Sequence, residues 1–136
     1  MSFIPLLHAL HVCANLLWIG GIVGVAVILP GSLGTKEIRG AIALRMYRRL
    51  ANPAFMVSFL AGTTLLLMNP AYYFVHTHMM HAKLPLALGV VALHHWLGRR
   101  TRRMASGEAT PPGQLPMVLL LVAAMGAAAL ALLKPF

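Results

Sequence analysis

Four long apolar stretches, separated by polar segments, dominate the pattern of the chain. Each is close to the length that a helix needs to cross about 30 Å of hydrocarbon at about 1.5 Å per residue. An isolated strand would leave its backbone groups unpaired in lipid, so each stretch is expected to be helical. The predicted spans run from about 3 to 29, 50 to 68, 80 to 97 and 115 to 133.

The segments between the spans place most of the positive charge on one side. Residues 31–49 and 98–114 together hold nine of the eleven basic residues, and their positions along the chain require them to share a side. The positive-inside rule assigns that side to the cytoplasm. Both termini and the segment 69–79 are then expected on the outside. The second half of 31–49, from about Gly40, is predicted to be a basic helix that leads into the second span.

Composition supports a membrane protein. Of the 136 residues, 60% are hydrophobic and 10% are charged, whereas a soluble domain carries about 25% charged residues. We therefore predict one all-α integral membrane domain, a four-helix bundle. With two acids in the chain, both expected in polar loops, a paired-carboxylate mechanism is excluded. The single Cys13 excludes an internal disulfide and a cysteine-based metal cluster. The net charge of +9 is interpreted as a topology signal and as contacts with the lipid bilayer, not with nucleic acid.

Polar residues inside the first span are the first candidates for chemistry, because ionisable side chains are costly in a membrane and usually face the bundle interior. His8, His11, Asn15 and Trp18 are spaced three or four residues apart and form one stripe on a helix. One interpretation of this stripe is a set of hydrogen bonds between helices. The other is a cofactor site.

The outer end of the third span carries His81 and Lys83. The first and third spans both start outside, so His8 and His11 share a depth zone with these residues. Two histidines on facing helices are how a four-helix membrane protein holds a b-type haem. We expect haem b between the first and third helices, with His11 and His81 as metal ligands. His8 replaces His11 if the register differs by one turn, and Lys83 or an arginine would meet a propionate.

The inner end of the third span carries His94, His95 and Trp96, followed by Arg99 and Arg100. This combination is typical of an interfacial helix end, where such side chains snorkel or anchor the helix. A second cofactor there is the less favoured interpretation.

Copper is the competing cofactor. The outward-facing segment around the start of the third span mixes imidazole and thioether groups, and soft thioethers suit Cu(I). These residues are His76, His78, Met79, Met80 and His81. The alternative is that the histidines are solvated and the methionines begin an apolar helix. A third hypothesis is a structural membrane subunit without a cofactor.

Several short motifs have a characteristic order. They are His11 with Trp18-Ile19-Gly20-Gly21, Arg45-Met46-Tyr47 with Pro53, His81-Ala82-Lys83-Leu84 with His94-His95, and Pro116 with Leu133-Lys134-Pro135-Phe136. Together they resemble the HemJ-type protoporphyrinogen oxidase family and its CopD-like membrane relatives over nearly the whole chain. The resemblance implies haem b within the helices and an oxygen-independent oxidation of protoporphyrinogen IX to protoporphyrin IX. It implies His11 as the leading axial ligand, with Lys83 and Arg45 as catalytic candidates. It does not settle the second ligand, for which we prefer His81.

The chain also departs from that family. His8 stands where the family usually has a lysine, Val25–Val27 lacks the family's arginine, and Gln114 stands where the fourth helix usually has a glutamate. A proton-coupled oxidation needs proton acceptors, so electron transfer as a small cytochrome is kept as the alternative activity. The expected location is the bacterial inner membrane, with porphyrin or a redox protein as partner. The fourth helix is rich in small residues and would suit close packing in a homodimer.

Overall fold

The computed structural model describes residues 3–76 and 79–133. Within these residues the protein is all-helical, with no strand. The elements are α1 (Ile4–Ile28), α2 (Lys36–Met46), η1 (Tyr47–Ala51), α3 (Asn52–Met68), η2 (Tyr72–His76), α4 (Met79–Ala105) and α5 (Leu115–Leu133). The all-α prediction is confirmed. Besides the helices of the four predicted spans there is α2, which corresponds to the basic helix expected from about Gly40 and begins earlier, at Lys36.

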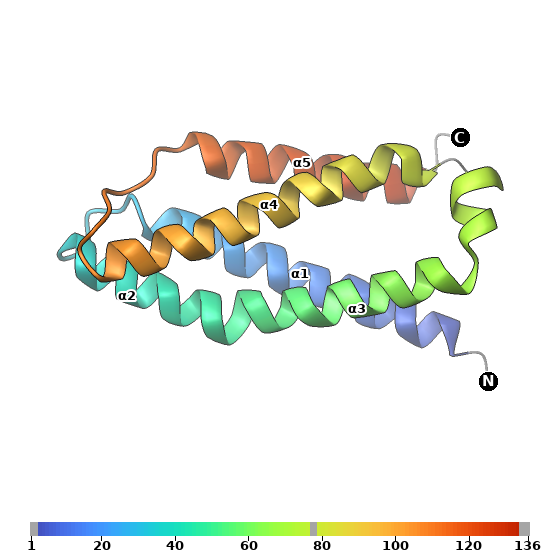
Figure 1. Ribbon diagram of the computed structural model, residues 1–136, viewed down its shortest axis with the longest axis horizontal. Helices are drawn as coiled ribbons and strands as arrows, with labels where there is room; N and C mark the ends of the chain where they lie inside the picture. Colours follow the sequence, from blue (N-terminus) through green and yellow to red (C-terminus); the bar gives the residue numbers. More distant parts are fainter. Residues whose placement is uncertain (1–2, 77–78, 134–136) are drawn as a thin grey trace.

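The helices form an elongated bundle (Figure 1). The continuous rod α2–η1–α3 lies antiparallel to α1, and α4 and α5 form a second antiparallel pair beside it. The start of α1 and the end of α5 lie at one end of the bundle. The start of α2 and the end of α4 lie at the other end, which we call the arginine end.

The rod α2–η1–α3 begins earlier than expected. Thr35 caps α2, because its hydroxyl accepts a hydrogen bond from the backbone N–H of Ile38 at 3.4 Å. The helix then continues into α3 through the π-helical turn η1, in which the N–H of Asn52 bonds the carbonyl of Tyr47. Pro53 follows directly and has no N–H to offer the carbonyl one turn back. The wider π-helical turn therefore lies directly before Pro53, at a point where proline would interrupt the hydrogen bonds of a regular α-helix.

The end of α4 corrects the predicted third span. The helix continues from the predicted end at about residue 97 to Ala105, so the arginines of 98–105 are helical. It stops at Gly107, whose φ of 81° is in the left-handed region. The N–H of Gly107 bonds the carbonyl of Met104, and the N–H of Glu108 bonds that of Arg103. This pair of bonds is a Schellman cap, which favours glycine at its left-handed position.

Two stretches of the described chain are long and apolar enough to cross a membrane, Ile4–Ile28 and Lys36–Met68. A shorter apolar stretch is Leu115–Ala127. The predicted third span lies in α4, which is not among these because its sequence combines apolar residues with Lys83 and the arginines. Length and composition therefore single out fewer helices than the four spans expected.

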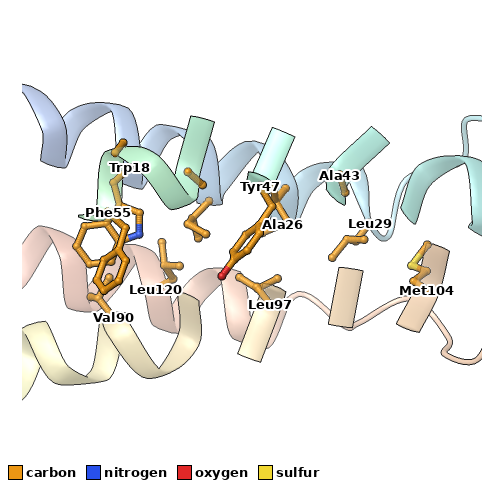
Figure 2. Packing of buried hydrophobic residues seen from close by; sticks show 14 residues of the cluster. Trp18, Ala26, Leu29, Ala43, Tyr47, Phe55, Val90, Leu97, Met104 and Leu120 are labelled. Carbon is orange, nitrogen blue, oxygen red and sulfur yellow. The ribbon is translucent and has the colours of Figure 1, made fainter. Parts of the chain in front are cut away.

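The core follows the long axis of the bundle. Trp18, Ile22, Val25 and Leu29 form the buried stripe of α1, spaced three or four residues apart. Figure 2 shows buried hydrophobic side chains in a row along the bundle, with Trp18 and Phe55 towards one end and Met104 at the other. The end of this row with Trp18 and Phe55 lies beside His94, which is described below.

Candidate functional site

His94 lies in the middle of the core, and its exposed fraction is 0%. The indole Nε1 of Trp18 donates to Nδ1 of His94 at 3.1 Å. Because an indole nitrogen can only donate, Nδ1 carries no proton, and Nε2 of the neutral ring does. Nε2–H therefore donates to the hydroxyl oxygen of Tyr47, also at 3.1 Å. Both ring nitrogens are used inside the bundle, so His94 does not snorkel towards a surface as predicted.

Aromatic rings enclose this histidine. The ring of Tyr47 stacks on His94 with 4.8 Å between centroids, and Phe55 packs against it at 4.7 Å. Gly98, one turn after His94, makes room for Tyr47, because a Cβ at this position would overlap the phenol ring. We call His94, Trp18, Tyr47, Phe55 and Gly98 the closed cluster.

His11 is the centre of a second cluster and is half-buried. Its Nδ1 lies 2.8 Å from the backbone carbonyl of Ser58. A carbonyl can only accept, so Nδ1 carries the proton and Nε2 has the free electron pair. The side-chain amide of Asn15 donates to that Nε2 at 3.0 Å, and the hydroxyl of Ser58 donates to Oδ1 of Asn15 at 2.7 Å. The three side chains form a closed ring of hydrogen bonds.

A glycine also faces this second histidine. A Cβ on Gly62 would lie 2.6 Å from Cε1 of His11 and 2.9 Å from its Nδ1. Gly62 is one turn after Ser58, so the missing side chain leaves the Ser58 carbonyl accessible to the imidazole. We call His11, Asn15, Ser58 and Gly62 the open cluster.

The other residues singled out from the sequence are distributed differently. His8 is exposed, and its Nδ1 lies 3.0 Å from the backbone carbonyl of Ile4. His81 is exposed, with Nε2 at 3.0 Å from the carbonyl of Phe74. Lys83 is half-buried. The start of α4 lies at the same end of the bundle as the start of α1, which carries His11 (Figure 1).

The predicted stripe of the first helix is divided between two sites. His11 and Asn15 belong to the open cluster, whereas Trp18 belongs to the closed cluster. Hydrogen bonds between helices, one of the two interpretations of the stripe, are therefore present at both sites.

Arg45 lies away from the other catalytic candidate. It lines a cavity of about 290 Å³ together with Arg48, Arg49 and Ala105. Ala105 ends α4, whereas Lys83 is near its start, 22 residues earlier, which corresponds to about 33 Å along a helix. Arg45 and Lys83 therefore cannot contact one small substrate together.

Metal ligands do not gather in the part of the chain that the structure describes. There, no group of three or more His, Cys, Asp or Glu side chains could hold a metal ion. His76 is described and exposed, whereas His78, of the predicted copper-binding segment, and Lys134-Pro135-Phe136, of the motif at the chain end, lie outside the described residues. This finding concerns a metal ion held by three or more protein side chains. Haem iron takes only one or two axial side chains, so the finding does not test haem binding.

The sequence analysis missed Tyr47, Ser58, Gly62 and Gly98 as members of these sites. The signal was a repeated spacing of four residues between a polar residue and a glycine, Ser58 with Gly62 and His94 with Gly98. Comparison with family models, curated proteins and solved structures finds no match for this chain.

Proposed function

We propose that the protein is an integral membrane protein of the bacterial inner membrane, with four spans, the arginine end in the cytoplasm and both termini outside. The support is the number of large apolar side chains on the outer faces of the helices. Leu16 of α1, Leu67 of α3 and Met125 of α5 are 70%, 72% and 70% exposed. A contiguous apolar surface on several helices would be covered by lipid.

We propose further that the open cluster holds haem b through Nε2 of His11. The observation that carries this proposal is the protonation of His11 at Nδ1, fixed by the Ser58 carbonyl. Ligating histidines commonly have this arrangement, in which the second nitrogen donates to a backbone carbonyl and the ring gains basicity. His94 has the opposite protonation, and its nitrogens are occupied by Trp18 and Tyr47.

The residues present fit one axial position directly. Asn15 holds the electron pair of His11 through a single amide hydrogen bond, and rotation of that side chain would free Nε2 for iron. His81 remains the proposed second ligand, because α1 and α4 start at the same end of the bundle, which places His81 and His11 near the same end. Lys83 would pair with a haem propionate. Bound haem would supply one-electron transfer at this site.

Oxidation of a porphyrinogen, as in the HemJ-type family that the motifs resemble, is the activity we propose, with electron transfer as a small cytochrome as the alternative. Proton acceptance would fall to His8, because His11 and His81 would hold the iron and the sequence has acids at Glu37 and Glu108 alone. Arg45 is not assigned a part in this reaction, because it lies towards the opposite end of the bundle.

An absorption spectrum of the purified protein, oxidised and then reduced with dithionite, tests the haem proposal. Expression with ample haem is expected to give a sharp Soret band and split visible bands on reduction. His11→Ala should abolish the band, whereas the matched variant His8→Ala, one turn away, should retain it. Helix content measured by circular dichroism shows whether both variants fold.

Two further variants define the coordination. Asn15→Ala removes the amide that competes with iron for Nε2, so haem retention should be kept or increased. His81→Ala should convert a six-coordinate low-spin spectrum into a five-coordinate high-spin one. A featureless spectrum of the native protein would overturn the proposal. Copper retained in metal analysis would then support the CopD-like alternative, and neither cofactor would support a structural subunit.

A further inference from the structure

The arginine end contains a small cavity whose chemistry is separate from both histidine clusters. It has a volume of about 140 Å³ and is lined by Trp96, Arg99, Arg100 and Arg103 of α4. Ligand sites for drug-sized molecules are usually about 300–1,000 Å³. This cavity therefore suits a small group and not a tetrapyrrole. We call it the α4 recess.

Arg100 lines this cavity, and its guanidinium is held in place. One end of its guanidinium is fixed, because Nη2 donates to the hydroxyl of Thr110 at 3.1 Å. Its Nε is buried and has no hydrogen-bond partner in the described part of the chain. A nitrogen without accessible surface is not reached from the recess, so a ligand there would meet the rest of the Arg100 side chain, which lines it.

The surrounding charge determines what kind of acceptor fits. The chain has eleven basic and two acidic residues. Of the acids, Glu37 has its Oε1 3.9 Å from Nζ of Lys36. Glu108 has its Oε2 3.9 Å from Nε of Arg103, in a largely exposed pair. Such an exposed pair neutralises little of the local charge. Three guanidinium groups around one small cavity match an anion with several oxygen atoms and more than one negative charge.

We propose that the α4 recess binds a phosphate group through the guanidinium groups of Arg99, Arg100 and Arg103. The phosphate could be the headgroup of an anionic phospholipid or a soluble phosphate. This proposal does not depend on haem. Its lipid form depends on the proposed membrane location, whereas its soluble form does not.

The test uses the purified full-length protein in mild detergent. Dioleoylphosphatidylglycerol is titrated against dioleoylphosphatidylcholine, and retained lipid is measured by native mass spectrometry. Inorganic phosphate is titrated separately by calorimetry. We expect selective retention of the anionic lipid, and about a tenfold loss of affinity in Arg100→Gln, the size expected when one charge-assisted contact is removed.

Arg102→Gln is the matched control, since Arg102 is an exposed arginine of the same helix and does not line the recess. It removes the same charge and should change the affinity by less than about twofold. Arg100→Lys keeps the charge and removes the planar guanidinium fork, so it should also weaken binding. If Arg100→Gln loses helix content, Arg103→Gln, at an exposed position, takes its place.

The outcomes separate the sources of the phosphate. Retained phosphatidylglycerol that inorganic phosphate does not displace indicates a lipid headgroup. Binding of inorganic phosphate without selective lipid retention indicates a soluble ligand. Equal losses in Arg100→Gln and Arg102→Gln, or binding of neither probe, would overturn the site. The Soret band of the native protein should be unchanged in Arg100→Gln, which keeps this test distinct from the haem proposal.

Discussion

The two histidine clusters are built from similar parts and differ in how firmly they are held. Each has an imidazole with both nitrogens hydrogen-bonded, and each has a glycine that makes room for the aromatic group beside it. In the closed cluster, bulky rings hold His94. In the open cluster, a backbone carbonyl and an amide hold His11, which is half-buried.

The difference shows that hydrogen bonding alone does not decide whether a histidine in a helix bundle is structural. Trp18 and Tyr47 cannot turn away from His94 without displacing the core, because they are themselves buried. Asn15 is half-buried and needs only a change of rotamer to release His11. The closed cluster is therefore expected to stabilise the bundle, and the open cluster to be available for ligand binding.

Replacing His94 should have the largest effect on stability. His94→Leu leaves the indole N–H of Trp18 and the hydroxyl of Tyr47 buried without their partner, and we expect a loss of about 3 kcal/mol. Thermal or denaturant unfolding in detergent, followed by circular dichroism, measures it. His95 is the exposed neighbour and serves as the control. The free energy of unfolding of His95→Leu should stay within about 0.5 kcal/mol of that of the native protein. Equal effects would contradict the structural role of His94.

Filling the space at Gly98 should have the next largest effect. A methyl group there presses on the buried ring of Tyr47, and we expect Gly98→Ala to cost about 2 kcal/mol. Gly89 is a matched control in the same helix, because a Cβ there meets nothing within 4 Å. Gly89→Ala should stabilise the protein by about 0.5 kcal/mol through helix propensity. A stabilised Gly98→Ala variant would show that Tyr47 is not confined.

The same change in the open cluster should cost less. Gly62→Ala places a methyl group against His11, but this ring is half-buried and can swing aside, so we expect about 1 kcal/mol. Gly20→Ala, where a Cβ meets nothing within 4 Å, is its control. The two unfolding curves measure the difference. A cost as large as that of Gly98→Ala would remove the proposed contrast between the clusters.

Ser58→Ala should have the smallest effect. It removes the hydroxyl that donates to Asn15, while the backbone carbonyl still accepts from His11. Asn15 is half-buried and can find water, so the expected loss is about 0.5 kcal/mol. Unfolding in detergent gives the stability, and haem titration tests whether a freer Asn15 changes the affinity. A loss above about 2 kcal/mol would mean that the open cluster is as rigid as the closed one.

Much of the helical organisation could be predicted from the apolar pattern, and the details that failed have physical reasons. The first predicted span, about 3–29, corresponds to α1, and the stripe from His8 to Trp18 predicted polar contacts on one helix face. The end of α4 was missed because the arginines suggested a loop, whereas arginine is a good helix former. Gly107, with its left-handed conformation, was the better stop signal.

The candidate sites were less predictable than the helices. His94 follows the rule that interfacial residues combine polar and aromatic groups, yet it is buried because Tyr47 and Trp18 satisfy both of its nitrogens. Those partners come from positions 47 and 76 residues away in the sequence. The spacing within one helix contains no information about which residue of another helix faces it.

The sequence by itself determined that this chain is helical and apolar, that its positive charge is concentrated around two segments, and that its histidines are the main chemical groups. These properties follow from periodicity and composition, which are local. Only the tertiary structure decided which nitrogen of His11 and of His94 carries the proton. That choice depends on whether the neighbouring atom is a donor, as in the indole of Trp18, or an acceptor, as in the carbonyl of Ser58. Packing between helices selects that neighbour, and it thereby separates a structural histidine from one able to offer an electron pair.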